Sequence, residues 1–531
     1  MTTPSPSALR TANLAALPLE LADRLRAEPP ASRVGIDDSG QPTWTRFRHP
    51  RPLTDAHCMH TVQALTGEGP VLLVGLGGGQ RLAWLLSHSE RTVFAWDPDL
   101  SIWQHILDTV DLREALADGR LVPLFGPDLL HCPEARSAHL VVHPDFEAAY
   151  ADGPSMLRAD APVALMVQGE LFVDDVARGL RTAGYRVLRW DIEHLPQAEH
   201  QHILGTAGAS LAVAINTREG LPEVLAAHRI PLAIWEIDPN TTGPAPVHGP
   251  SDGTVVFTYR RHNVPAHRRA GYRHVEVLPL AAPVHRFGPP DLQPSIPIAF
   301  VGASMAESAQ HKQAELRALF ADQPNILERL SRVLAVQRQD NTRWRVPELL
   351  ESVCPGLRAR VRQQHAGLDI AILLGEISAA EKRLTWLSHL GGLGLHVWGD
   401  AGWSLAQAHG VKWEGWADHF VDLPRIYASA AIHVDVPRLY QQDAVAMRVF
   451  DVMAAGGFLL AEHSPELVAL FRPGVELDTY RTPRELVDKC RFYLSQPAIR
   501  QRVAAAGRAR VLADHTIAGR VRTIVDRMGV R

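Results

Sequence analysis

The chain has 531 residues, a formal net charge of −4 at pH 7, 46% hydrophobic residues and 21% charged residues. A chain of this length holds roughly two to four domains, and this composition is ordinary for a globular protein. The near-neutral balance excludes a bulk electrostatic footprint for nucleic acid or for an anionic membrane, although local basic sites remain open.

Cysteine usage and the absence of long apolar runs narrow the class further. The four cysteines are widely spaced, with no CxxC or Cys/His metal spacing and no disulfide framework. We therefore expect a reducing, cytoplasmic compartment, no bound metal and no cofactor. No apolar run approaches the roughly 18–20 residues of a membrane span. The start of the chain lacks a secretory pattern, and residues 1–50, rich in proline, predict a loosely structured arm.

After this arm, short apolar strands alternate with amphipathic helices, which predicts parallel sheets with helices on both faces and hence an α/β fold. In the first block, residues 51–155, we expect helices at 79–88 and 100–117 and strands at 71–75, 92–96, 120–125 and 139–143. In the second block, residues 160–287, we expect a helix at 174–184 and strands at 163–168, 185–191, 210–216, 231–238, 254–259 and 274–280.

A proline-rich segment, residues 288–297, predicts a linker between the second block and the third. The third block, residues 298–531, ends in a long helical stretch. Its predicted strands are 298–302, 369–375, 394–400, 431–436 and 458–462.

The first block contains a glycine-rich turn, VLLVGLGGGQRL (71–82), between a strand and a helix. Gly75, Gly77 and Gly79 let the backbone turn tightly and approach a ligand, and the helix N-terminus offers N–H groups to an anion. Asp97 ends the next strand, where an acid can accept hydrogen bonds from ribose hydroxyls. The GxGxG pattern favours a methyltransferase-type motif over a dinucleotide one. A tight turn in a domain without a ligand is the alternative.

This block also resembles the N-terminal part of motility-associated (Maf-type) glycosylation proteins. The resemblance is carried by the GLGxG turn at Gly75–Gly79, by Asp97-Pro98-Asp99 and by His143-Pro144. It implies an additional N-terminal Rossmann-like domain. It also hints at an acceptor on a protein such as flagellin, or on a surface glycan.

The strand PLAIWEIDPN (231–240), in the second block, leaves polar residues at its end. Carboxyl ends of parallel strands border the ligand crevice of an open α/β sheet. Trp235, Glu236 and Asp238 can therefore line a cleft. The alternative is a strand end whose acid caps the following turn.

The strongest pattern is DAVAMRVFDVMAAGGFLLAE (443–462), in the third block. Asp443 and Asp451 are spaced so that both lie toward one side of a helix with about 3.6 residues per turn. The helix predicted over 444–455 ends at Gly456-Gly457. Its N-terminus would favour a diphosphate through free N–H groups and the helix dipole. A small-residue helix packed under a sheet, with solvated acids, is the alternative.

From residue 163 onward, the order of motifs resembles the CgeB-like (spore maturation protein) group of GT-B glycosyltransferases. The matching stretches are PLAIWEIDP, the segment 254–287, IAFVGAS, LPRIYASAAIHVDV, RVFDVMAAGGFLLAE and the segment 465–516. The resemblance implies two Rossmann-like domains facing a cleft. A nucleotide-sugar donor would bind mainly to the second lobe and the acceptor to the first, in a hexosyltransferase-like enzyme that needs no metal.

The resemblance also implies roles for individual residues. In related GT-B enzymes, two glutamates eight residues apart contact the donor, and Asp443 and Asp451 match them, each one methylene shorter. Gly302 opens the second lobe. Candidates for the cation that holds the phosphates are Lys312, Arg448 and Arg425.

The acceptor hydroxyl of an inverting enzyme needs a base. Candidates are Glu236, Asp238, His194 and His202. Two other interpretations stay open. One is a bifunctional S-adenosylmethionine methyltransferase and glycosyltransferase. The other is a degenerate, non-catalytic GT-B binding protein, which the two aspartates in place of glutamates motivate.

Overall fold

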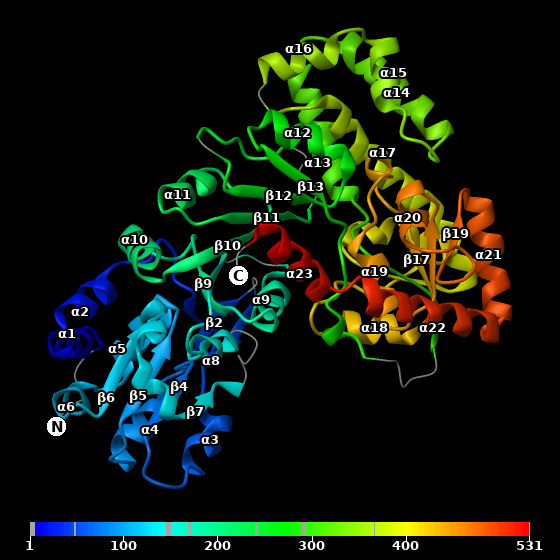
Figure 1. Ribbon diagram of the computed structural model, residues 1–531. Coiled ribbons are helices and arrows are strands. Elements are labelled where there is room, and N and C mark those ends of the chain that lie inside the picture. The colour runs from blue at the N-terminus through cyan, green and yellow to red at the C-terminus, as the bar shows by residue number, and fades with distance from the viewer. Residues whose placement is uncertain are drawn as a thin grey trace. The chain divides into compact units, whose positions relative to one another are not determined.

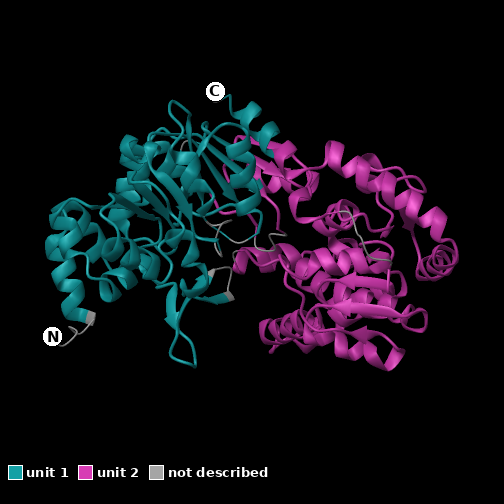
Figure 2. Ribbon diagram, turned by 90° about the horizontal axis from the view of Figure 1, so that it is seen from below, with its two compact units in different colours: residues 1–235, 247–255, 521–531 teal, residues 236–246, 256–520 magenta. Residues whose placement is uncertain are grey.

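The computed structural model (Figure 1) describes residues 6–529 except 47–48, 145–149, 168, 170, 239–242, 250, 289–293 and 366. The chain divides into two compact units (Figure 2). The first comprises residues 1–235, 247–255 and 521–531, and the second comprises residues 236–246 and 256–520. Among the described residues, no helix is long and apolar enough to cross a membrane.

The first unit begins with ordered elements in place of the loosely structured arm that the composition predicted. They are α1 (Pro6–Ala16), α2 (Leu19–Arg26) and an antiparallel sheet of β1 (Val34–Ile36), β2 (Pro42–Arg46) and β3 (His49–Pro52). Asn13 is fully buried. Its amide donates to the carbonyls of Leu107 and Val110 and accepts from the N–H of Leu112. These contacts are distant in sequence, so local composition does not reveal them.

A four-stranded parallel sheet forms the centre of the N-terminal domain. Its order is β6 (Leu121–Phe125), β5 (Val93–Asp97), β4 (Val71–Val74), β7 (His139–Val142). The connecting helices include α4 (Gln80–His88), α5 (Leu100–Thr109) and α6 (Arg113–Ala117). The strand order reverses between β4 and β7, and the carboxyl ends of strands at such a switch point are where open α/β sheets bind ligands.

The second sheet has six strands in the order β13 (His274–Val277), β12 (Thr254–Thr258), β11 (Leu232–Glu236), β10 (Ala209–Ile215), β8 (Val163–Val167), β9 (Arg186–Trp190). β10 pairs in parallel with β8 and β11, and β8 pairs in parallel with β9. The accompanying helices are α8 (Asp152–Met156), α9 (Val173–Thr182), α10 (Gln197–Thr206), α11 (Leu221–Ala227) and α12 (Val264–Arg269).

The third sheet lies within the second unit and is parallel throughout. Its order is β16 (Lys412–Trp413), β15 (Leu395–Trp398), β14 (Ile296–Val301), β17 (Ala430–Asp435), β18 (Leu459–Glu462), β19 (Asp478–Tyr480). Its apolar strands share a buried core with α21 (Pro483–Ser495) and α22 (Pro497–Asp514). α18 (Leu423–Ser429), α19 (Met447–Ala454) and α20 (Pro465–Leu470) are helices that connect its strands. The last helix is α23 (Ile517–Met528).

The strand predicted at 369–375 is wrong, because this segment begins the long helix α17 (Ile370–Ser388). A short apolar run fits a buried helix as well as a strand. Asp369 caps the helix by accepting a hydrogen bond from the N–H of Ala371. Four helices precede it and share an apolar core with it: α13 (Ala306–Leu319), α14 (Pro324–Gln339), α15 (Val346–Val353) and α16 (Leu357–Gln364).

The helix predicted over 444–455 is shorter than expected. α19 begins at Met447 and ends at Ala454, and Gly456 then turns the chain with a φ of +78°. Asp443 therefore lies in the turn before the helix, whereas Asp451 lies within it. The eight-residue spacing does not place the two acids on one helix.

Candidate functional site

A cavity of about 290 Å³ in the second unit adjoins the end of β14, the segment after β17 and the start of α19. Such carboxyl ends of parallel strands are the expected position of a ligand site. The lining residues are Ile237, Tyr259, Leu280, Val301, Arg383, His419, Leu423, Tyr427, Pro437, Arg438, Gln441, Ala444, Ala446, Met447, Arg448 and Asp451.

Three arginines, Arg383, Arg438 and Arg448, give this cavity a positive wall. Arg383, from α17, donates to the carbonyls of Val436 and Ala303 at 3.1 and 2.8 Å. Burial, and then repulsion from Arg448 and Arg438, lower the pKa of Arg383 to about 9. The cationic form of Arg383 is therefore destabilised here, so a bound anion would be stabilised by the same side chains.

Arg448 extends from the first turn of α19. It forms an ion pair with Asp435 at 2.6 Å, donates to the carbonyl of Val301 and lies over the ring of Phe300. Gly302 gives it room, because a Cβ at this position would lie 2.8 Å from the guanidinium of Arg448. Gly302 and Arg448, both predicted at the donor site, thus lie next to each other. The missing side chain of Gly302 leaves space for the guanidinium.

Asp451 is the acid that lines the cavity. It is 1% exposed and lies on α19, one turn after Arg448. Burial and then the negative charge of Asp451 raise the pKa of Tyr427, which lines the same cavity. A buried carboxylate beside arginines provides acceptors for hydroxyl groups next to a site for an anion.

Three other predicted donor residues are not among those that line the cavity. Asp443 forms an ion pair with Arg260. Lys312 lies on α13 and pairs with Glu315 at 2.8 Å. Arg425 is exposed on α18.

The acceptor-side acids predicted from the second block, Glu236 and Asp238, are also not among the residues that line the cavity. Glu236 is 3% exposed and accepts hydrogen bonds from Thr258 and Asn263. Burial opposes its ionisation, but its contact with His267 and these hydrogen bonds lower the pKa of Glu236. Asp238 is exposed and follows the cavity residue Ile237.

The remaining candidates lie outside that cavity. His194 and His202 belong to the first unit, where His194 contacts Asp191 at 3.0 Å and His202 lies 3.7 Å from Asp128. Trp235 is fully buried and stacks on Phe172.

The glycine-rich turn of the N-terminal domain is packed against its own chain. Gly75, Gly77 and Gly79 all have positive φ values, as the tight turn requires. A Cβ on Gly75 would clash with the ring of Tyr150, and one on Gly77 would clash with the carboxylate of Asp55. The space that glycines would leave for a ligand is therefore filled by protein side chains.

Asp55 occupies the position of an anion at the start of α4. Its carboxylate accepts hydrogen bonds from the N–H groups of Gly78 and Arg81 at 2.9 and 3.0 Å. Burial opposes its charge, but His143 and the backbone of Arg81 outweigh this and lower the pKa of Asp55. A resident carboxylate thus takes the interactions that a phosphate or a ligand carboxylate would make.

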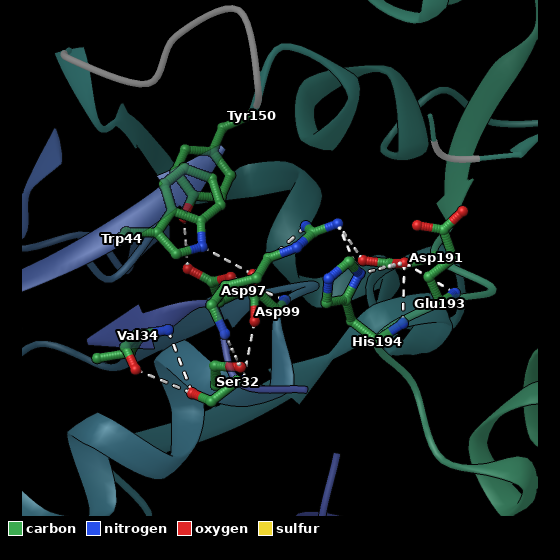
Figure 3. A network of polar contacts seen from close by, with 11 residues as sticks. Ser32, Val34, Trp44, Asp97, Asp99, Tyr150, Asp191, Glu193 and His194 are labelled. Atoms are coloured by element: carbon green, nitrogen blue, oxygen red, sulfur yellow. Dashed lines mark hydrogen bonds and ion pairs between the residues drawn. The ribbon is translucent and has the colours of Figure 1, made fainter. Parts of the chain in front are cut away.

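Asp97, the predicted ribose acceptor, is engaged in the same way. It accepts from the N–H groups of Leu76 and Asp99 and from the hydroxyl of Tyr150, all within 3.0 Å. Burial and the nearby Asp99 raise the pKa of Asp97 to about 7. Figure 3 shows these carboxylates close to the rings of Trp44 and Tyr150, which stack at 6.0 Å. The adjacent cavity, lined by Trp44, Asp99 and Tyr150 among others, is about 40 Å³.

One group among the described residues has side chains close enough to hold a metal ion: Asp55, Cys58 and His143, all buried. The sequence did not indicate this group because His143 lies far from the other two along the chain. Asp55 already accepts backbone hydrogen bonds, and the guanidinium of Arg81 lies 3.9 Å from it. The negative charge of this group is therefore already balanced by protein groups.

Comparison with known proteins bears on the second unit. Residues 381–526 match the model of the family described as glycosyl transferase-like. The C-terminal part of the chain is glycosyltransferase-like. The matched segment includes Arg383, Arg438, Arg448 and Asp451, so most polar residues of the cavity fall within it. The match confirms the class of enzyme expected from the sequence, a glycosyltransferase.

No curated protein matches the chain. Solved structures do match it, at low sequence identity. Sucrose-phosphate synthase from Thermosynechococcus elongatus is 12% identical over 70% of this chain and 99% of its own, with a TM-score of 0.42. A glycosyltransferase from Rickettsia africae ESF-5 is 11% identical over 70% and 98%, with the same TM-score. The Maf glycosyltransferase from Magnetospirillum magneticum AMB-1 is 15% identical over 44% and 54%, with a TM-score of 0.22. At these TM-scores the likenesses carry no argument about the site.

The parallel sheets confirm the predicted fold class, a GT-B type α/β fold with an additional N-terminal Rossmann-like domain. Sequence reasoning missed Arg383 and Arg438 as cavity residues. Arg383 follows a segment that was predicted as a strand, and Arg438 lies outside the motifs. The sequence did contain one local indication of Arg383, because a basic residue on an otherwise apolar helix face needs a partner.

Proposed function

We propose that this chain transfers a sugar from a nucleotide-sugar donor to an acceptor hydroxyl, and that the donor binds in the cavity of the second unit. The observation that carries the proposal is the convergence of Arg383, Arg438 and Arg448 beside the buried carboxylate of Asp451. A nucleoside diphosphate needs this combination, because it presents phosphate oxygens and ribose hydroxyls a short distance apart.

The arginines would stabilise the diphosphate leaving group. Breaking the sugar–phosphate bond places negative charge on the diphosphate and leaves an oxocarbenium-like sugar. Fixed donors in a partly buried site stabilise such developing charge because they need little reorganisation. The N-terminus of α19 lies at the same wall, through Ala446 and Met447, and adds free N–H groups. These groups can do this work without a metal ion.

Asp451 would accept hydrogen bonds from the ribose hydroxyls. Its place on α19 after Arg448 keeps it one turn from the phosphate wall. A carboxylate held by a helix within the core is pre-ordered, so little side-chain entropy is lost when the donor binds.

The acceptor and its base belong to the same proposal. Asp238 is exposed and adjoins the cavity residue Ile237, whereas Glu236 is buried, so we propose Asp238 as the acid that takes the proton. We propose a CgeB-like glycosyltransferase acting in the cytoplasm. The Maf-type resemblance of the N-terminal domain supports a protein acceptor such as flagellin, or a surface glycan.

A donor screen tests the proposal. UDP-, GDP-, dTDP- and CMP-sugars are compared for thermal stabilisation of the full chain and for release of the nucleotide. One donor should stabilise the wild type and be turned over, and Asp451→Asn should reduce both effects. Asp514→Asn, at an exposed acid of α22, is the matched control. Equal donor affinity in wild type and Asp451→Asn would refute the assignment of the cavity. Binding without turnover would favour the non-catalytic alternative.

A further inference from the structure

We infer that Arg260 is a positioning residue of the donor cavity, which fixes the segment 440–443 in front of α19. The inference deepens the proposed function and rests on it. Arg260 does not line the cavity, but the residues next to it and next to its partner do: Tyr259 on one side, and Gln441 and Ala444 on the other.

The contact between Arg260 and Asp443 is close, and it joins a buried guanidinium to a carboxylate that is 30% exposed. The Nε of Arg260 lies 3.1 and 3.2 Å from the two carboxylate oxygens of Asp443, and its terminal nitrogen also contacts that carboxylate. The same nitrogen donates to the carbonyl of Tyr440 at 3.3 Å. Arg260 is 7% exposed. The guanidinium therefore holds the segment at two points, one on a side chain and one on the backbone.

The charge of Arg260 is maintained by this pairing. Burial opposes the charge, but hydrogen bonding and attraction to Asp443 outweigh it and raise the pKa of Arg260. A fork of N–H donors matched to a carboxylate also fixes the geometry of both partners, which a lysine cannot do.

Arg260 is itself held from behind. Its N–H donates to the hydroxyl oxygen of Thr258, and that hydroxyl lies within hydrogen-bond distance of Glu236. Glu236 also accepts from Asn263 and lies 3.1 Å from the ring of His267. Arg260 is thus connected through Thr258 to a buried polar cluster, and this connection fixes the position of its backbone.

This arrangement gives Asp443 and Glu236 a use different from the direct contacts with substrate that the sequence suggested. Together with Arg260 they set the distance between the wall that carries Tyr259 and the wall that carries Gln441 and Ala444. Without the guanidinium, the segment 440–443 loses two attachments immediately before α19, and the diphosphate end of the cavity loses its fixed width.

Three variants of the full chain test the inference: Arg260→Gln, Asp443→Asn and the exchanged pair Arg260→Asp with Asp443→Arg. Arg261→Gln, at the adjacent exposed arginine, is the control. Hydrogen exchange of residues 438–446 is measured without any donor, and nucleotide-sugar affinity, KM and kcat are measured separately. Each single variant should speed exchange in this segment about tenfold and raise KM by a similar factor, with a smaller change in kcat. The exchanged pair should recover part of both.

The two readouts separate the possible failures. Unchanged exchange in 438–446 for Arg260→Gln would overturn the inference, whatever the donor results. Lower thermal stability with unchanged KM would also overturn it, because that is the outcome of a purely structural ion pair. Faster local exchange in a chain that binds no nucleotide-sugar would leave Arg260 as the residue that orders the segment, and would refute the proposed function instead.

Discussion

Two strand–turn–helix junctions, each predicted from the sequence to bind a ligand at a helix N-terminus, have opposite structural outcomes. The turn after β4 is glycine-rich and precedes α4, yet Asp55 and Tyr150 fill the space beside it. The junction around α19 borders a cavity of about 290 Å³ with three arginines. A glycine signal predicts a close approach to the backbone. It does not reveal whether the approaching group is a ligand or another part of the chain.

The largest expected effect concerns the filled junction. Replacing Asp55 by Ala should lower the free energy of unfolding by about 3–5 kcal/mol, because buried Arg81 and His143 lose their anion and α4 loses its cap. Denaturant unfolding monitored by tryptophan fluorescence measures this loss, with Asp38→Ala at an exposed acid as the control. A loss as small as that of the control would show that Asp55 is no substitute for a bound anion.

A substitution at the open junction, the one around α19, should change the affinity for the nucleotide-sugar. Arg383→Gln should weaken binding of the nucleotide-sugar by about 10- to 100-fold, equivalent to about 1.5–3 kcal/mol, because a buried charged donor to the diphosphate is lost. Titration calorimetry measures the affinity, and exposed Arg332→Gln on α14 serves as the control. Undiminished affinity would place the diphosphate elsewhere.

At the filled junction, the one after β4, Asp97 should make the stability of the protein depend on pH. The pKa of Asp97 is raised from 3.8 to about 7 in the folded chain, so its stabilising contribution is complete below about pH 4 and is lost as the pH rises through 7. Between pH 5 and pH 7 this amounts to about 2 kcal/mol. The stability of Asp97→Asn relative to the wild type should therefore increase by that amount over this range. A difference that does not change with pH would contradict the buried position of Asp97.

The smallest expected effect is a null result that sharpens the comparison. Titration calorimetry with millimolar S-adenosylmethionine should give only the heat of dilution, because Tyr150 and Asp55 occupy the space beside the glycine-rich turn. Measurable binding would show that these side chains move aside, and would restore the bifunctional alternative.

The sequence predicted what local patterns determine. Most strands of the three parallel sheets lie where the apolar runs indicated. Arg448 and Asp451 both line the cavity, and Gly302 lies next to the guanidinium of Arg448. The failures involve information that the local pattern lacks. The run at 369–375 is apolar enough for a strand, and only the helix-forming sequence after it and the cap at Asp369 decide for a helix.

The two aspartates show the same limit within the site. Their spacing fits one face of a helix, but the helix begins only at Met447, so Asp443 is left free to pair with Arg260. The occupant of the glycine-rich turn, Tyr150, and the partner of Asp443, Arg260, both come from distant parts of the sequence. A single sequence without such contacts cannot supply these partners.

The position of helix α17 has a consequence for how distant changes affect donor affinity. It is 19 residues long, about 28 Å, and its first half packs into the core shared with α13–α16, while Trp386 and Leu387 pack into the core of the third sheet. Arg383 lies between these two cores. The helix therefore links the core of α13–α16 to the side chain that we propose binds the phosphates. We expect a substitution or a bound protein that shifts α13–α16 to change donor affinity, although none of these four helices supplies a lining residue of the cavity.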